Sequence, residues 1–237
     1  MVASAGAIRG LIFDFDGLIL DTELPVFHSL QEICQEHGCS LSLASWASYI
    51  GTSHEFNILD YLEAQLGHPV DRAAIAAKRR ERELELIQLQ SVMPGVEGYI
   101  SEAKRLGLKL GLASSSSRAW VTEHLTRLGL EAHFGSIKCA DDVSQTKPNP
   151  ELYQAVLAEL GLQPTEAVAL EDSPNGILAA KRAGLFCVAV PNALTRQLPL
   201  NDADIRLESL ADLPLERLLL ELEKRRRAAQ PHRPASP

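Results

Sequence analysis

The sequence is poor in cysteine and has no long hydrophobic run. None of its four cysteines belongs to a Cys-x-x-Cys pair, and no histidine stands at zinc-ligand spacing from two of them, which argues against a zinc site. No stretch approaches the roughly 18 apolar residues of a membrane span, and residues 1–9 lack the cationic start and apolar core of a secretory signal. We therefore expect a cytoplasmic protein with no membrane partner, whose cysteines are free thiols: Cys34, Cys39, Cys139 and Cys187.

Positive charge is also scarce. Lysine and arginine number 23 against 31 aspartates and glutamates, for a net charge of −8. A nucleic-acid-binding protein needs a cationic surface, so this balance argues against a nucleic-acid partner. It does not exclude a small phosphorylated substrate, which a few local cations can bind. The remaining composition, 46% hydrophobic and 23% charged over 237 residues, is typical of a globular chain with a large core.

Short apolar segments alternate with helical segments along most of the chain. Strands are predicted at residues 8–14, 108–113, 167–170 and 186–190, with a weaker pattern at 136–139 and a sixth candidate at 204–207. Helices are predicted at 95–106, 117–128, 150–160 and 174–183; two of them begin at Asn-Pro or Ser-Pro, and glycine follows their ends. The alternation predicts an α/β fold, a doubly wound parallel sheet with helices on both faces.

Residues 22–93 interrupt this alternation because they contain only helical patterns, at 24–37, 54–66 and 71–89. We expect them to form a separate α-helical domain, inserted into a core of residues 1–21 and 94–220. Near the C-terminus, Leu215, Leu218, Leu219 and Leu222 mark one face of a last helix. Residues 221–237, which include a cationic run at 224–227, are predicted to be a basic, frayed tail.

Two aspartates follow the first predicted strand. Because alternate side chains of an extended chain share a face, Phe13 and Phe15 can enter the core while Asp14 and Asp16 emerge together. Two carboxylates at the end of a buried strand repel each other and lose solvation, so such a pair needs a cation or a reason to share a proton. The plainer alternative is a solvated turn acid beside a helix cap.

Three further polar segments follow other predicted strands or precede helices. They are the serine row 114–117, the proline-stiffened loop 146–150 that carries Lys147, and the acidic pair Glu171 and Asp172. Each alone has an ordinary explanation as a helix cap or a solvated loop. Ligands of an open parallel sheet, however, bind at the carboxyl ends of its strands, where all of these segments should meet. Carboxylates there suit Mg²⁺, and hydroxyls and lysine suit phosphate.

These motifs, in this order, resemble those of the haloacid dehalogenase superfamily: Asp14-x-Asp16-Gly17, Ser114, Lys147 and Glu171-Asp172. The helical insertion resembles the C1 cap of that superfamily. Residues 14–23, Asp-Phe-Asp-Gly-Leu-Ile-Leu-Asp-Thr-Glu, and residues 170–176, Leu-Glu-Asp-Ser-Pro-Asn-Gly, are most similar to the β-phosphoglucomutase-like phosphatase branch. The resemblance extends to about residue 220 and implies a Rossmann-like core.

The resemblance also implies a reaction, the Mg²⁺-dependent hydrolysis of a small phosphorylated metabolite, such as a sugar or polyol phosphate, through an aspartyl-phosphate. Asp14 would be the nucleophile, Asp16 the general acid and base, and Ser114 and Lys147 the ligands of the phosphoryl oxygens. The implied metal ligands are Asp14, Asp16 through its main-chain carbonyl, Glu171 and Asp172. The expected substrate-binding residues are Gly17, Glu23, His54, Ser115 and Lys147.

Two other functions are compatible with these motifs. β-Phosphoglucomutases carry an arginine in the cap loop and a histidine near the start of the cap, and the matching positions here are His54 and Val26. Both departures weaken a mutase assignment, and His54 is as compatible with a structural role as with a substrate contact. A non-catalytic ligand-binding protein of this fold would have no use for the acid at Asp16. No feature demands an oligomer, so we expect a monomer.

Overall fold

The fold centres on a parallel β-sheet. The computed structural model describes residues 7–47 and 56–229. Within them, six strands lie in the order β3-β2-β1-β4-β5-β6, and every neighbouring pair is parallel. The strands are β1 (Gly10–Phe13), β2 (Lys109–Ala113), β3 (Ser136–Lys138), β4 (Ala167–Glu171), β5 (Phe186–Ala189) and β6 (Ile205–Arg206). The chain runs outward from β1 in both directions, which confirms the predicted doubly wound sheet.

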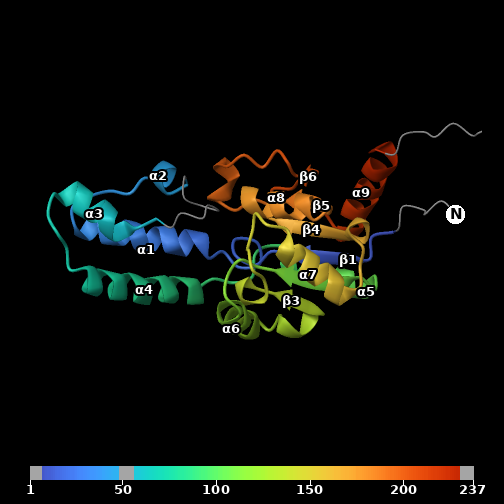
Figure 1. The fold of residues 1–237 in the computed structure, drawn as a ribbon, viewed down its shortest axis with the longest axis horizontal. Helices are drawn as coiled ribbons and strands as arrows, with labels where there is room; N and C mark the ends of the chain where they lie inside the picture. Colours follow the sequence, from blue (N-terminus) through green and yellow to red (C-terminus); the bar gives the residue numbers. More distant parts are fainter. Residues whose placement is uncertain (1–6, 48–55, 230–237) are drawn as a thin grey trace, which may run out of the picture.

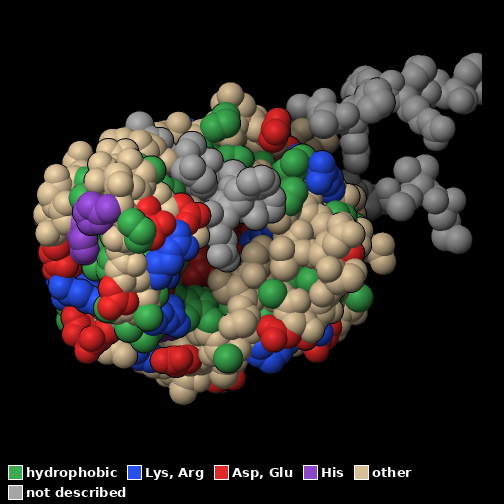
Figure 2. All heavy atoms as spheres, turned by 60° about the vertical axis from the view of Figure 1, so that its left-hand side comes forward, with side chains coloured by type: hydrophobic (Ala, Val, Ile, Leu, Met, Phe, Trp, Pro, Cys, Tyr) green, Lys and Arg blue, Asp and Glu red, His purple; other side chains and the backbone are tan. Residues whose placement is uncertain are grey.

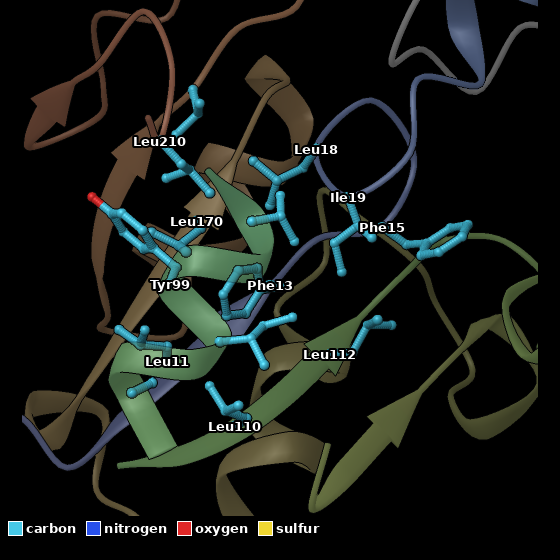
Figure 3. Packing of buried hydrophobic residues seen from close by; sticks show 14 of the residues in the cluster. Leu11, Phe13, Phe15, Leu18, Ile19, Tyr99, Leu110, Leu112, Leu170 and Leu210 are labelled. Atoms are coloured by element: carbon cyan, nitrogen blue, oxygen red, sulfur yellow. The ribbon is translucent and has the colours of Figure 1, made fainter. Parts of the chain in front are cut away.

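Alternate residues of the central strand face two different helical layers. Leu11 and Phe13 belong to the cluster on one side of the sheet, and Ile12 belongs to the cluster on the other. Figure 3 shows Phe13 on the first side, close to Leu112 and beneath the helix that carries Tyr99. Neighbouring strand residues point to opposite faces, so a sheet covered twice requires the continuous apolar runs seen in the sequence.

Helices cover both faces of the sheet. The face of Phe13 is covered by α5 (Val96–Arg105), α6 (Arg118–Leu128) and α9 (Leu215–Ala229), and the face of Ile12 by α7 (Glu151–Leu160) and α8 (Pro174–Arg182). The hydroxyls of Ser117 and Ser173 cap α6 and α8 by accepting backbone N–H groups. Short 3₁₀ turns complete the connections: η1 (Glu131–His133), η2 (Ala140–Asp142), η3 (Pro164–Glu166) and η4 (Thr195–Gln197).

A helical insertion lies beyond one end of the sheet, at the left of Figure 1. It consists of α1 (Glu23–Glu36), α2 (Leu43–Ala47), α3 (Ile58–Leu66) and α4 (Arg72–Gln88). These helices pack around a hydrophobic cluster of their own, which includes Phe27, Leu30 and Leu62. Leu194, from the loop after β5, is buried in the same cluster, so the insertion also rests on the sheet domain.

The two chain segments that join the insertion to the sheet run side by side. Leu20 and Val92 form an antiparallel bridge, and the N–H of Met93 donates to the carbonyl of Ile19 at 2.9 Å. The insertion is therefore attached through a paired crossing that begins only a few residues after Asp16.

Three elements differ from the sequence-based expectation. The short helix α2 was not predicted, and α3 begins at Ile58, where the side chain of Asn57 caps it; residues 54 and 55 of the predicted helix lie outside the described part of the chain. Helix α9 continues to Ala229 instead of fraying from residue 221. Leu222 is fully buried on it, and one turn further Arg226 donates to the carbonyl of Thr165. The apolar face of α9 is therefore continued by the aliphatic part of the Arg226 side chain.

The four cysteines are free. Among the described helices, none is both long and apolar enough to cross a membrane.

Candidate active site

Three neighbouring strands end level with one another at one edge of the sheet. Phe13 of β1 pairs with Leu112 of β2 and with Leu170 of β4. The polar residues that follow these positions are Asp14 and Asp16 after β1, Ser114 after β2, and Glu171 and Asp172 at the end of β4. The parallel register therefore brings together side chains that are more than 150 residues apart in the chain.

Lys147 lies at the centre of this edge. Its Nζ is 2.6 Å from Oδ1 of Asp14 and 2.7 Å from Oε1 of Glu171, and its side chain is only 6% exposed. The hydroxyl of Tyr153 donates to the same oxygen of Glu171. Burial lowers the pKa of Lys147, but the charges of Asp14 and Glu171 more than offset this, so the pKa lies above its usual value. The lysine is therefore a fixed cation.

Asp14 has an unusually high pKa. Burial and the charge of Glu171 raise the pKa of its carboxyl to about 7, although Lys147 acts in the opposite direction. Burial and then the charges of Asp14 and Glu171 raise the pKa of Asp172 well above its usual value. One lysine therefore does not balance the negative charge of this buried edge.

The same three carboxylates could hold a metal ion. One oxygen from each of Asp14, Glu171 and Asp172 lies within 4.8 Å of the others. Oε2 of Glu171 is buried and has no hydrogen-bond partner in the described part of the chain. An all-oxygen donor set with an excess of negative charge fits Mg²⁺, which takes one or two carboxylates together with waters and a phosphate. The residues present thus fit the cation that the motifs imply.

Gly17 makes room for Asp172. It has a φ of +81°, and a Cβ atom there would lie 2.4 Å from Oδ2 of Asp172 and 2.5 Å from Nδ2 of Asn192. In the space left free, Nδ2 of Asn192 donates to Oδ2 of Asp172 at 2.9 Å. The glycine therefore permits a close approach that orients an acidic side chain.

The side chain of Asp16 has hydrogen-bond partners of its own. Its Oδ1 accepts from the hydroxyl of Thr22 at 2.9 Å and from Nε1 of Trp120 at 3.0 Å. Its Oδ2 accepts from the hydroxyl of Ser116 at 2.6 Å and from that of Ser114 at 3.3 Å. The two aspartates of the first motif thus occupy different environments, one beside a lysine and one among hydroxyls and an indole.

A cavity of about 380 Å³ opens in front of these residues. Figure 2 shows it as a hollow between the helical insertion, on the left, and the sheet domain, with acidic side chains at its bottom. The lining residues come from both parts: Asp14, Asp16, Thr22, Glu23, Val26, Ser115, Ser116, Trp120, Thr146, Lys147, Asp172, Ser173 and Asn175. Acidic groups, hydroxyls and one lysine therefore surround a space large enough for a small metabolite.

Glu23 is an acidic residue of the insertion that lines this cavity. It begins α1 and is half-buried. Burial, followed by the charges of Asp16 and Asp21, raises the pKa of its carboxyl to about 7. Its carboxyl therefore keeps a proton to higher pH than an exposed glutamate does, and a protonated carboxyl can donate as well as accept a hydrogen bond.

The comparisons with known proteins agree with this geometry. Residues 11–190 match the family described as haloacid dehalogenase-like hydrolase. The Bacillus subtilis protein named "Putative phosphatase YhcW" is 50% identical over 212 residues, which cover 90% of this chain and 96% of that protein. The chain belongs to the haloacid dehalogenase-like hydrolase family.

More distant members of the family include both phosphatases and a mutase. Hexitol phosphatase B of Escherichia coli K12 is 29% identical, covering 90% of this chain and 97% of its own, and β-phosphoglucomutase of Bacillus subtilis is 28% identical, covering 92% and 97%. The solved structure of CbbY from Rhodobacter sphaeroides in complex with phosphate is 32% identical, with a TM-score of 0.67, and covers 87% of this chain and 96% of that one. Together these matches identify a phosphoric monoester hydrolase.

Most residues expected from the haloacid dehalogenase motifs meet at this one cavity. Asp14, Asp16, Glu23, Ser115 and Lys147 line it, and so does Asp172. The lysine loop and the second acidic pair, which were uncertain in position from the sequence, contact Asp14 or lie within ligand distance of it.

Two expected residues are placed differently, and a third is not described. Ser114 is fully buried and directs its hydroxyl to Asp16 rather than into the cavity. Gly17 does not line the cavity, because the carboxylate of Asp172 fills the space in front of it. His54 lies outside the described residues.

Sequence reasoning did not assign four of the side chains that shape the site. Thr22, Ser116 and Trp120 hold Asp16, and Asn192 holds Asp172. Thr22 and Ser116 stand inside motifs and could have been suspected. Trp120 and Asn192 carry no such signal, because tertiary contacts across many residues define their roles.

Proposed function

We propose that this enzyme is a Mg²⁺-dependent phosphatase of sugar or polyol phosphates that works through an aspartyl-phosphate on Asp14. The observation that carries the proposal is the ion pair of Asp14 with Lys147 at the bottom of the cavity, with Asp16 two residues further on. An acidic side chain beside a fixed cation can approach an anionic phosphate. The second aspartate, in a different environment, can exchange protons.

The proposed first step is a displacement at phosphorus. A carboxylate oxygen of Asp14 forms a bond to phosphorus while the bond from phosphorus to the ester oxygen breaks. The carboxyl of Asp16 gives its proton to that leaving oxygen, so the product leaves as an alcohol. Asp14, Glu171 and Asp172 would hold Mg²⁺, which would neutralise charge between the carboxylate and the phosphate.

The second step regenerates the enzyme. Asp16, now ionised, takes a proton from a water molecule that attacks phosphorus, and the bond from phosphorus to Asp14 breaks. Inorganic phosphate and free Asp14 result. Throughout, we expect Lys147 and Ser115, both on the cavity wall, to hold phosphoryl oxygens.

The helical insertion is proposed to act as a cap that covers the leaving group. Among the described residues, those that it contributes to the cavity wall are Thr22, Glu23, which can donate or accept hydrogen bonds, and the apolar Val26. Such a wall suits an uncharged, hydroxyl-rich leaving group. The likeness to hexitol phosphatase B, a protein named for polyol phosphates, supports this choice.

A mutase of the β-phosphoglucomutase type is the weaker alternative. A mutase must hold a second phosphate, whereas the described lining of the cavity contains one cationic side chain, Lys147. That lysine is already engaged by two carboxylates. Net hydrolysis is therefore favoured over transfer between two hydroxyls.

Phosphate release from a panel of sugar and polyol phosphates tests the proposal. The panel contains sorbitol 6-phosphate, mannitol 1-phosphate, glucose 6-phosphate and glucose 1-phosphate, each with MgCl₂ and with EDTA. Asp14→Asn should lower kcat by about 10⁴-fold or more, as loss of a nucleophile does. Asp60→Asn, the same exchange at an exposed position, should leave kcat unchanged.

Two outcomes would overturn the proposal. Full activity of Asp14→Asn would remove the nucleophile. Interconversion of glucose 1-phosphate and glucose 6-phosphate without phosphate release would instead establish the mutase.

A further inference from the structure

Trp120 makes an unusual contact for an aromatic residue at the start of a helix. It stands on the first turn of α6, and its Nε1 donates to Oδ1 of Asp16 at 3.0 Å. The two residues are 104 positions apart in the chain. The indole is half-buried and also lines the cavity. It therefore lies where it can influence both the acid and the substrate.

The indole differs in kind from the other donors to Asp16. Thr22, Ser114 and Ser116 contribute hydroxyls, each of which can rotate and accept a hydrogen bond as well as donate one. An indole N–H only donates, and the plane of its ring sets its direction. Among the described partners of Asp16, Trp120 thus supplies the donor of fixed direction.

The indole ring is itself held from two elements. The guanidinium of Arg80, on α4 of the insertion, lies over the ring with Cζ 5.6 Å from its centroid. The ring of His124, one turn further along α6, packs against it edge-on at 4.3 Å between centroids. Arg80 is in turn held by Glu83 at 2.9 Å. A rigid donor fixed from both sides is suited to orienting a side chain.

We propose that Trp120 is a positioning residue that keeps the carboxyl of Asp16 aligned for proton transfer to the leaving oxygen. The inference rests on the proposed function, in which Asp16 gives its proton as the bond from phosphorus to the ester oxygen breaks. Losing the indole N–H leaves Asp16 chemically intact, but the donors that the structure still describes for it are three hydroxyls, which can rotate with the carboxyl. Arg80 contributes by holding the indole from the side of the insertion.

The choice of leaving group separates this role from a structural one. An alcohol needs the proton as it departs, whereas p-nitrophenol departs as a stable anion and needs none. The ratio kcat/KM reports the steps through departure of the leaving group. A defect in Asp16 alignment must therefore appear with an alkyl phosphate and be absent with p-nitrophenyl phosphate, whereas a general loss of folded enzyme lowers both.

The central experiment compares Trp120→Phe with the wild type on sorbitol 6-phosphate, or the best substrate of the panel, and on p-nitrophenyl phosphate. Because Trp120→Phe removes a hydrogen bond to a carboxylate, kcat/KM on the alkyl phosphate should fall by about 10- to 100-fold. The value for p-nitrophenyl phosphate should be nearly unchanged. Trp120→His should restore much of the loss, because Nε2 of imidazole occupies the ring position of the indole Nε1.

The other tryptophan provides a matched control. Trp46, in the insertion, is also buried, and its Nε1 has no hydrogen-bond partner in the part of the chain that the structure describes. Trp46→Phe removes the same atoms and should not alter the ratio of the two kcat/KM values. If Trp120→Phe does not fold, as judged by circular dichroism, Arg80→Met serves instead. It loosens the indole while Arg79 still pairs with Glu83, and should show the same signature at smaller amplitude.

The outcomes are separable. Equal losses on both substrates, or no loss on either, would overturn the role of Trp120 while leaving the phosphatase assignment intact. If Trp120→Phe does not fold, an Arg80→Met variant in which the ratio of the two kcat/KM values is unchanged would also overturn the role of Trp120. A wild type that releases phosphate from neither substrate would overturn both.

Discussion

The ion pairs at the sheet edge and those on the helical insertion involve the same residue types in opposite environments. Lys147 is 6% exposed, whereas Lys78, which pairs with Glu36 at 2.6 Å, is 59% exposed. Arg82 likewise reaches Glu32 at 2.8 Å in an exposed position. Exposed pairs contribute little to stability, whereas removing one partner of a buried pair leaves an unbalanced charge in a poorly solvated site. Short distances alone therefore do not distinguish the two regions, and burial does.

The sharpest test of this contrast removes one lysine from each region. Without metal, Lys147→Met should lower the free energy of unfolding by about 3–5 kcal/mol, because Asp14 and Glu171 lose their cation. Lys78→Met should change it by less than about 1 kcal/mol. Urea denaturation in EDTA measures both. Equal effects would mean that burial does not set the strength of these pairs.

Adding Mg²⁺ should stabilise only the sheet edge. If Asp14, Glu171 and Asp172 bind the ion, MgCl₂ at 100 times its Kd should raise the free energy of unfolding by about 2.7 kcal/mol. Asp172→Asn should reduce this gain strongly, and the surface exchange Asp60→Asn should preserve it. Thermal unfolding with and without MgCl₂ gives the answer without any activity assay. A wild-type Tm that does not change on addition of MgCl₂ would contradict the metal site.

Two helical glycines, Gly176 and Gly98, differ in how crowded the space around them is. A Cβ at Gly176 would lie 1.8 Å from Oε2 of Glu171, whereas one at Gly98 would have no atom within 4 Å. Gly176→Ala should therefore destabilise the protein by about 1–3 kcal/mol through overpacking. Gly98→Ala should stabilise it by about 0.5–1 kcal/mol through helix propensity. Chemical denaturation compares them, and a stabilised Gly176→Ala would show that Glu171 is not held where it lies.

The smallest effect concerns a buried residue with no ionic partner. His124 is 2% exposed, and neither ring nitrogen has a hydrogen-bond partner within the described residues. Burial lowers its pKa below the usual 6.5, so the unfolded chain binds the proton more readily. Stability should then fall as the pH drops below 6.5. His124→Phe should remove that acid loss, so the Tm of the variant relative to the wild type should be higher at pH 5 than at pH 8. A gain that does not depend on pH would exclude titration of His124 as its cause.

The sheet was predictable from the sequence because its strands are local apolar runs bounded by turn and cap residues. Most of the site was also predictable, since Asp14, Lys147 and Asp172 follow strands whose carboxyl ends share one edge. The length of α9 and the extra helix α2 were not, because packing decides where weak patterns end. Arg226 illustrates this. From the sequence, its charge suggests a solvated tail, but in the structure its side chain is buried against the sheet domain and the helix continues past it.

By itself the sequence determined the layered α/β plan, the inserted helices and the set of polar residues that would meet, because local periodicity and parallel strands leave few alternatives. Only the tertiary structure decided the environment of each carboxylate. It placed Asp14 and Glu171 on one buried lysine, turned Asp16 towards the indole of Trp120, and set Asp172 against Gly17 and Asn192. Burial and neighbouring charge set the chemistry of a carboxyl group, and both depend on residues far away in the chain.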